Sequence, residues 1–159
     1  MKNIKLLFMD VDGTLTDGKI YIGNNGEMFK AFDAKDGCGI HDILPLNGII
    51  PVIITARESD IVKRRCDELN ITHCYQGCRK KKEKMLEVAS EFGIYPNDEG
   101  VLPGVAYMGD DILDIQCLEI SEFKGCPQNA VHRVKEICDF IAEHDGGNGA
   151  VREFIEWLI

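Results

Sequence analysis

The chain has 159 residues, of which 45% are hydrophobic and 28% are charged, and its formal net charge is −9 at pH 7. A chain of this length buries about 70% of the surface that it exposes when unfolded, so we expect one domain over residues 1–159. The negative charge argues against nucleic acid as a partner, and no apolar run approaches the ~20 residues that a membrane-spanning helix needs.

The cysteines and the first residues bear on the compartment. The seven cysteines are an odd number without a C-x-x-C pair, a pattern typical of free thiols in a reducing compartment. The N-terminus has some positive charge and an apolar run, like a signal peptide, but the run is short and ends in acids. We therefore expect a cytoplasmic protein.

The first predicted strand covers residues 6–9 and ends in two carboxylates, Asp10 and Asp12. Alternation along a strand places both on the same side. Gly13 and Thr14 then begin a turn. Placing two acids at the end of a buried strand is costly unless a cation or a reaction uses them, although an aspartate-rich turn is the structural alternative.

A β-hairpin is expected within about residues 19–33, because an Asn-Gly pair lies between two β-prone segments, 19–22 and 28–32. Its side chains offer more apolar surface than an isolated hairpin can hide. A short helix should begin near Asp36, and a second buried strand at 49–54 should lead into Thr55, Ala56 and Arg57.

The rest of the chain alternates predicted helices and strands. Such alternation predicts an α/β fold with a doubly wound parallel sheet, in which the residues after each strand meet at one edge. The expected elements are a helix at 58–69, a strand at 72–75, a helix opened by the basic cluster 79–84, a loop at 95–104, strands at 105–108 and 123–126, a helix near 130–136, and a Gly-rich loop and helix over 146–159.

Four polar groups follow the predicted strands in order: Asp10 and Asp12, Thr55, a lysine near 81, and the acids at 110, 111 and 114. Phosphoryl transfer through an aspartyl phosphate needs this combination. A cation must relieve the repulsion between a carboxylate and a phosphate ester, and hard oxygen ligands favour Mg²⁺. A receiver domain also uses acids, a threonine and a lysine, but its phosphorylated aspartate closes the third strand, where this chain has Tyr75 and Gln76.

The stretch KLLFMDVDGTLTDG resembles the first motif of the haloacid dehalogenase superfamily. The segments FDAKDGCGI, ITAR, RCDELNITHCYQG, YMGDDILD and GGNGAVREF resemble its capless phosphatases of 2-keto-3-deoxy sugar acid phosphates. The resemblance implies a Mg²⁺-dependent hydrolase without a cap domain, assembled as a homotetramer through the hairpin. The implied substrate is 3-deoxy-D-manno-octulosonate 8-phosphate, a precursor in lipopolysaccharide biosynthesis.

The resemblance also implies roles for particular residues. Asp10 would be the nucleophile and Asp12 the general acid and base. Mg²⁺ would be held by Asp10, a backbone carbonyl of Asp12 and Asp110, with Asp111 and Asp114 orienting these ligands and the lysine. Thr55 and Lys81 would bind the phosphoryl oxygens, and the expected substrate contacts are Gly13, Thr14, Ala56, Arg57 and Arg65.

Several alternatives stay open at this point. Lys80 stands where the family usually has Asp, so Lys80 or Lys84 could replace Lys81 as the active lysine. Related phosphatases of nine-carbon sugar acids tend to have an acid where this chain has Arg57, which favours the eight-carbon substrate without excluding the other. We expect Arg65 to reach a neighbouring subunit's site, and we expect the Gly146–Gly149 loop to give the C-terminal segment the freedom to act as a mobile flap. A phosphotransferase or mutase, and a non-catalytic oligomerisation module, are the competing functions.

Overall fold

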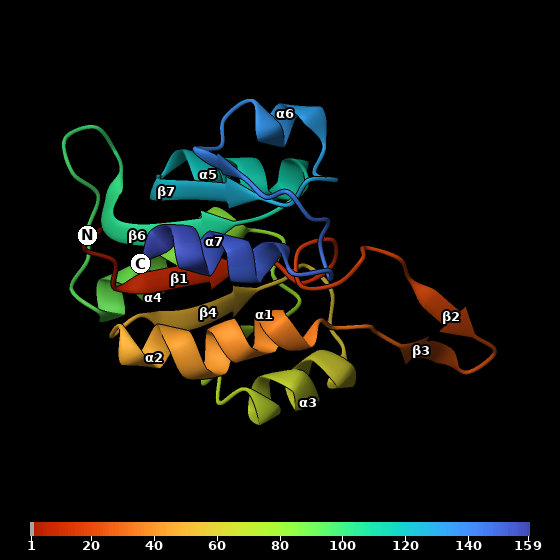
Figure 1. Cartoon of the computed structure of the whole chain (residues 1–159). Helices are drawn as coiled ribbons and strands as arrows, with labels where there is room; N and C mark the ends of the chain where they lie inside the picture. The colour runs from red at the N-terminus through yellow and green to blue at the C-terminus, as the bar shows by residue number, and fades with distance from the viewer. Residues whose placement is uncertain (1) are drawn as a thin grey trace.

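The computed structural model describes residues 2–159, and it is built on one six-stranded sheet in the order β5-β4-β1-β6-β7-β8 (Figure 1). Every neighbouring pair of strands is parallel, so the predicted doubly wound α/β fold is confirmed. The strands of this sheet are β1 (Leu6–Met9), β4 (Ile50–Ile54), β5 (His73–Tyr75), β6 (Leu102–Met108), β7 (Ser121–Cys126) and β8 (Phe140–Ile141).

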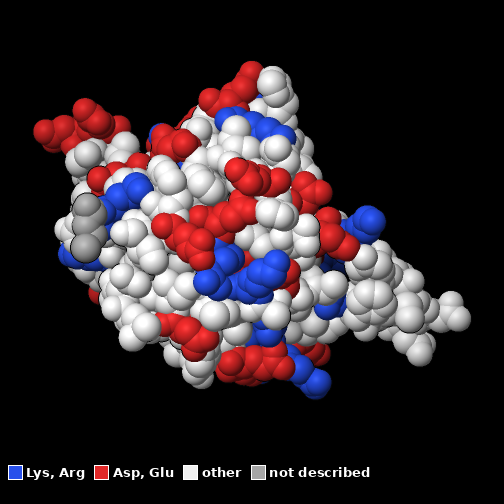
Figure 2. Space-filling model, in the orientation of Figure 1, with Lys and Arg blue, Asp and Glu red and all other residues white. Residues whose placement is uncertain are grey.

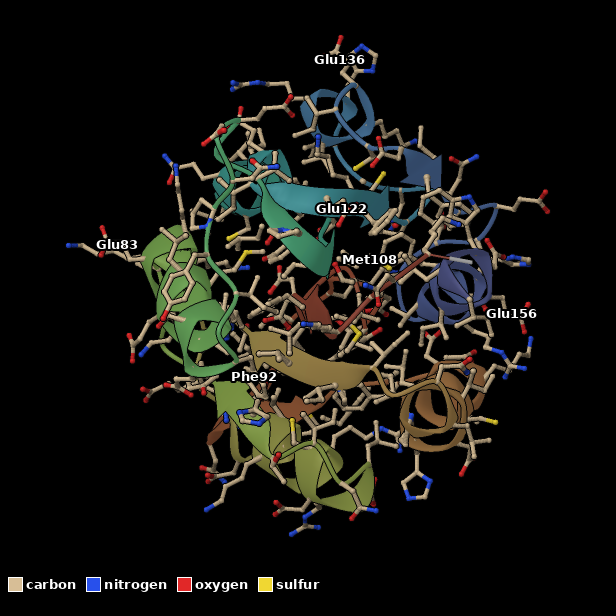
Figure 3. All side chains as sticks on the ribbon, turned by 90° about the vertical axis from the view of Figure 1, so that its left-hand side faces the viewer. Glu83, Phe92, Met108, Glu122, Glu136 and Glu156 are labelled. Carbon is tan, nitrogen blue, oxygen red and sulfur yellow. The ribbon has the colours of Figure 1, made fainter. Side chains whose placement is uncertain are left out.

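Helices cover both faces of the sheet, as a view along the strands shows (Figure 3). Leu7 and Met9 of β1 pack into one hydrophobic layer, whereas Leu6 and Phe8 pack into the other, because successive side chains of a strand point to opposite faces. The first layer is closed by α1 (Ala34–Cys38), the π-helical turn η1 (Gly39–Ile43), α2 (Leu44–Leu46), α3 (Asp60–Glu68) and α7 (Ala150–Leu158), and the second by α4 (Lys81–Glu91), α5 (Ile115–Glu119) and α6 (His132–Lys135).

The strand order reverses beside β1, and this reversal positions the site. After β1 the chain builds β4 and β5 on one side, and it then crosses back to add β6 on the other side. Met9 therefore pairs with both Ile53 of β4 and Met108 of β6. The loops that leave these three strands diverge, which opens a crevice at the carboxyl end of the sheet.

The predicted hairpin is present as β2 (Tyr21–Gly23) and β3 (Gly26–Phe29), which form a separate antiparallel pair. It projects beyond the carboxyl ends of the sheet strands (Figure 1). Gly23 pairs with Gly26, so the turn is Asn24-Asn25, and Gly26 adopts the positive φ of 107° that this tight turn requires. In the described chain the hairpin is the only insertion between β1 and α1, and no cap domain covers the sheet edge.

Several element boundaries differ from the expectation by one to three residues, and two of these differences have a local physical reason. Strand β6 begins at Leu102 rather than at residue 105, because the register between β6 and β7 shifts after Leu102 and this irregularity accommodates Pro103. Helix α3 begins at Asp60 rather than at residue 58, because the backbone N–H of Ser59 donates to Gln76 Oε1 at 2.8 Å.

No helix within residues 2–159 is both long and apolar enough to cross a membrane. The seven cysteines are all free thiols.

Candidate active site

Asp10 is the residue immediately after β1, the strand that lies between β4 and β6 in the sheet. Its backbone N–H donates to the carbonyl of Met108 at 3.1 Å, so the sheet still fixes the main chain at this point. The carboxylate is almost fully buried, and its Oδ1 accepts the backbone N–H of Val11 at 2.8 Å and the Lys81 ammonium at 2.9 Å. Both bonds use Oδ1, which leaves Oδ2 as the oxygen available for reaction.

Lys81 is the first residue of α4, and only 2% of its surface is exposed. Its Nζ lies between Asp10 Oδ1 at 2.9 Å and Asp114 Oδ1 at 2.8 Å. A cation at a helix N-terminus opposes the helix dipole, so the two carboxylates must account for its position. Burial disfavours the charged form, but these carboxylates outweigh burial and raise the pKa of Lys81. Lys80 and Lys84 instead pair with Glu83 and Glu87.

Asp114 is fully buried, and hydrogen bonds to both of its carboxylate oxygens hold it in place. Its Oδ1 accepts from Lys81 and from the hydroxyl of Tyr107 at 2.6 Å. Its Oδ2 accepts the backbone N–H groups of Asp110 at 3.0 Å and Asp111 at 3.2 Å. With both oxygens occupied, Asp114 shapes the loop after β6 and orients Lys81, while Asp111 accepts from Ile112 N and begins the 3₁₀ turn η2 (Ile112–Asp114).

Asp110 approaches the first loop from the β6 side. Thr14 donates its hydroxyl hydrogen to Asp110 Oδ1 at 3.2 Å. Gly13 has φ of 91°, and a β-carbon there would lie 2.0 Å from Asp110 Oδ2. Gly13 and Thr14 were expected to contact substrate, but the structure places both against Asp110 rather than in the lining of the cleft.

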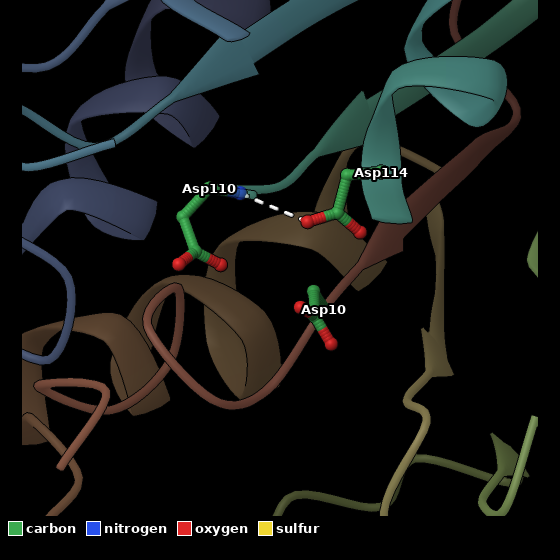
Figure 4. A group of neighbouring side chains, drawn as sticks. All are labelled: Asp10, Asp110 and Asp114. Carbon is green, nitrogen blue, oxygen red and sulfur yellow. Dashed lines mark hydrogen bonds between the residues drawn. The ribbon is translucent and has the colours of Figure 1, made fainter. Parts of the chain in front are cut away.

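The three carboxylates of Asp10, Asp110 and Asp114 carry more negative charge than Lys81 can balance. One oxygen from each lies within 4.8 Å of the others (Figure 4). Burial, followed by repulsion from Asp114, raises the pKa of Asp10 to about 7. Burial, followed by the charges of Asp10 and Asp114, raises the pKa of Asp110 to about 8. Three anions and one ammonium leave two negative charges, and hard oxygen donors with that excess fit a divalent ion such as Mg²⁺.

The carboxylate of Asp12 contacts Lys30, the residue that follows strand β3 of the hairpin. Lys30 donates to Asp12 Oδ1 at 2.5 Å, and Arg57 Nε lies 4.0 Å from Asp12 Oδ2. Lys30 also contacts Glu27 Oε1 at 2.8 Å. Burial disfavours the ammonium, but its hydrogen bonds to both acids outweigh burial and raise the pKa of Lys30.

A cleft opens above these groups at the carboxyl end of the sheet. Thr55 is the residue after β4 and lines the cleft. Its backbone N–H donates to Tyr75 O at 3.0 Å, and its carbonyl accepts from Cys78 N at 2.9 Å. Arg57 and Arg79 are exposed and place two positive charges on the wall. The lining residues are Asp10, Asp12, Thr55, Ala56, Arg57, Arg79, Lys81, Asp111 and Leu113.

Arg65 does not join this cleft. Its guanidinium packs within its own chain, 3.5 Å from Asp33 O and 3.1 Å from Glu68 Oε2. Its role toward a neighbouring subunit stays a prediction.

The Gly146–Gly149 loop lies against the first motif, and the mobile flap expected of the C-terminal segment stays a prediction. Gly147 N donates to Thr14 O at 3.2 Å, and a β-carbon on Gly146 would lie 1.9 Å from Gly13 O. Because glycine has no side chain, the backbone of this loop can approach the backbone of the first motif closely.

Sequence reasoning missed Lys30, Glu27, Ser59, Tyr107 and Arg79. Four of them act through contacts that depend on the tertiary fold, and no local pattern marks them. Arg79 was visible as part of the basic cluster, and its place after the third strand could have suggested that it lines the cleft.

Comparison with known proteins shows the family of the chain. The 3-deoxy-D-manno-octulosonate 8-phosphate phosphatase of Escherichia coli is 39% identical over 158 residues, which are 99% of this chain and 80% of the relative. The chain belongs to this phosphatase family of the haloacid dehalogenase superfamily. No general family model matches the sequence.

Solved structures of the family have the same fold. The Moraxella catarrhalis phosphatase, in complex with magnesium, phosphate and the sugar acid, has a TM-score of 0.90 and 38% identity, covering 99% of this chain and 86% of that chain. A haloacid dehalogenase superfamily hydrolase from Legionella pneumophila has a TM-score of 0.90 and 35% identity, covering 99% and 82%.

Proposed function

We propose that the protein is a Mg²⁺-dependent phosphatase that hydrolyses 3-deoxy-D-manno-octulosonate 8-phosphate in lipopolysaccharide precursor synthesis, with residues 1–159 acting as one phosphatase core. The observation that carries the proposal is the placement of Lys81 between the buried Asp10 and Asp114, beside the partly buried carboxylate of Asp110, at the carboxyl end of β1. Mg²⁺ held by Asp10, the Asp12 carbonyl and Asp110 would neutralise this negative charge and polarise a phosphoryl oxygen.

In the first half of the reaction, Asp10 Oδ2 attacks phosphorus and forms a new P–O bond. The bond between phosphorus and the sugar oxygen breaks, its electron pair stays on that oxygen, and the Asp12 carboxyl gives it a proton. Lys81 and the Thr55 hydroxyl bind the phosphoryl oxygens, where charge develops. The product of this half-reaction is an aspartyl phosphate and the free sugar acid.

In the second half, a water oxygen attacks phosphorus while the Asp12 carboxylate takes its proton. The bond between phosphorus and Asp10 breaks, and its electron pair returns to the carboxylate, which releases inorganic phosphate and restores the enzyme. Asp12 thus gives one proton and takes one back in each cycle.

Arg57 and Arg79 support a substrate with a second negative group. Arg57 Nε is 4.0 Å from its nearest carboxylate oxygen, and both side chains are exposed on the cleft wall, so both guanidinium groups are accessible to a carboxylate. A sugar acid phosphate offers that group, whereas a hexose phosphate does not. A nine-carbon 2-keto-3-deoxy acid 9-phosphate is the alternative substrate.

A homotetramer is the assembly that we propose. Ile22 and Met28 on the hairpin are 68% and 64% exposed, and the hairpin surface in Figure 2 is largely uncharged. A neighbouring copy could cover this apolar surface and help to exclude water from an uncapped cleft. Free thiols support a cytoplasmic location.

Release of inorganic phosphate tests the function. Purified protein should hydrolyse the eight-carbon sugar acid phosphate faster than the nine-carbon acid or hexose phosphates, and EDTA should abolish the activity until Mg²⁺ is restored. Preference for hexose phosphates would overturn the substrate, and activity that EDTA leaves unchanged would overturn the metal-dependent mechanism.

A further inference from the structure

Lys30 is enclosed on a hairpin whose other side chains are largely exposed. Its side chain is only 2% exposed, whereas the adjacent Phe29 and the nearby Met28 are 49% and 64% exposed. The ammonium contacts Asp12 Oδ1 at 2.5 Å and Glu27 Oε1 at 2.8 Å. Burying an ammonium is costly, so this contact needs a reason beyond closing the surface.

The second partner of Lys30 is itself fixed to the body of the protein. Glu27 Oε2 accepts the Ser59 hydroxyl at 2.5 Å. The backbone N–H of Ser59 donates to Gln76 Oε1 at 2.8 Å. The ammonium is therefore held, through Glu27, to the loops that follow β4 and β5 and carry the cleft residues.

The contact between Lys30 and Asp12 uses one carboxylate oxygen and leaves the other without a bond to Lys30. Lys30 takes Oδ1, while Oδ2 lies 4.0 Å from Arg57 Nε, a residue of the cleft wall. We propose that Lys30 is the positioning residue of Asp12: it fixes the carboxyl group so that Oδ2 faces the oxygen that leaves the phosphate. The hairpin then contributes to the first half of the reaction as well as to any interface. This inference rests on the proposed phosphatase function.

The role has a chemical consequence that a purely structural role lacks. A sugar oxygen must be protonated as it leaves, so an Asp12 that is no longer aimed correctly slows its departure. p-Nitrophenolate leaves as a stable anion and needs no proton. Because kcat/KM reports only steps up to the formation of the aspartyl phosphate, it isolates this half-reaction from the later attack of water.

The test compares kcat/KM for the sugar acid phosphate and for p-nitrophenyl phosphate at saturating Mg²⁺. Lys30→Met keeps a side chain as long as the aliphatic stem of lysine and removes the ammonium with its charge and donors. Since general acid catalysis contributes about 10²–10⁴-fold, we expect Lys30→Met to lose roughly 10²-fold on the sugar acid phosphate. On p-nitrophenyl phosphate we expect a loss of less than about threefold, because the leaving group needs no general acid. Lys30→Arg should restore part of the selective loss.

Lys19→Met is the matched control, because Lys19 is an exposed lysine of the same hairpin segment, and it should change neither value. If Lys30→Met does not fold, Glu27→Gln loosens the ammonium while Lys30 remains, and a smaller loss with the same substrate selectivity is expected. Equal losses on both substrates, or no loss, would overturn the positioning role. A parent protein without Mg²⁺-dependent hydrolysis of either substrate would overturn the proposed function itself.

Discussion

Gly13 lies so close to Asp110 that a β-carbon on the glycine would stand 2.0 Å from Asp110 Oδ2. The glycine also has a φ of 91°, in the left-handed region that L side chains rarely adopt. The backbone of the first motif and a metal-binding carboxylate of the proposed site therefore fit together only if residue 13 has no side chain.

Gly13→Ala should consequently lose most activity, because the methyl group displaces Asp110. The variant should bind Mg²⁺ at least tenfold more weakly by calorimetry, an order of magnitude in line with the loss of a ligand's supporting contact. Gly100→Ala is the control, since Gly100 has a φ of 79° with nothing within 4 Å of its β-carbon. It should cost only about 1–2 kcal/mol of stability. Unchanged Mg²⁺ affinity in Gly13→Ala would contradict the account.

The features that sequence predicted well are those with a local cause. The run 6–9 followed by Asp10 and Asp12 indicates a buried strand with a polar end, because composition and alternation act over a few residues. The alternation of strands and helices then predicts a parallel sheet, and a parallel sheet brings its carboxyl ends to one edge. The crevice followed from these rules without knowledge of any side-chain contact.

The remaining features depend on how distant elements pack. Lys30 meets Asp12 because the hairpin folds back over the end of β1, and no spacing rule predicts that angle. Tyr107 could be read only as a core residue of β6, although its hydroxyl reaches Asp114. Arg65 lies off the apolar face of α3, which suggested an outward direction, but α1 packs beside it and engages its guanidinium.

Mg²⁺ should stabilise the protein more at pH 8 than at pH 5. The pKa values of Asp10 and Asp110 are raised from 3.8 to about 7 and about 8, first by burial and then by neighbouring carboxylates. The folded, metal-free protein thus holds protons that the unfolded chain has already lost above pH 4, so its stability falls as pH rises toward 8. Metal binding requires the ionised carboxylates, so the affinity for Mg²⁺ rises over the same pH range.

Thermal unfolding with and without Mg²⁺ measures this effect. At pH 8 and a Mg²⁺ concentration 100 times its dissociation constant, the stabilisation should be about 2.7 kcal/mol. For a chain of this size that corresponds to a rise in Tm of roughly 5–10 °C. The rise should shrink markedly at pH 5. An equal or larger rise at pH 5 would show that the acids are already ionised there, contrary to the account.

Arg57→Ala and Arg79→Ala should each raise KM for the sugar acid phosphate about tenfold or more, because a charge-assisted hydrogen bond to the substrate carboxylate is lost. KM for a hexose phosphate should change less, since it has no carboxylate. Lys80→Ala provides the control, because Lys80 pairs with Glu83 outside the cleft lining. Equal effects on both substrates would assign the arginines to the phosphate rather than to the carboxylate.

Ile22→Asp combined with Met28→Asp should break the proposed tetramer into smaller species, measured as a fall in mass by light scattering. Both side chains are exposed in the single chain, so the fold itself should be retained. Tyr95→Asp alters an equally exposed side chain, 64%, outside the hairpin and should leave the mass unchanged. A parent protein that is already monomeric and fully active would refute the assembly.

The central claim is that Asp10 carries the phosphoryl group between the two halves of the reaction. Substrate labelled with radioactive phosphorus is mixed with excess enzyme and Mg²⁺, and the reaction is quenched in acid within the first turnover. Label should be bound to the protein and released by hydroxylamine, as expected of an acyl phosphate, and Asp10→Asn should carry no label. Label-free protein in a reaction that releases phosphate, together with parent-level hydrolysis by Asp10→Asn, would contradict it.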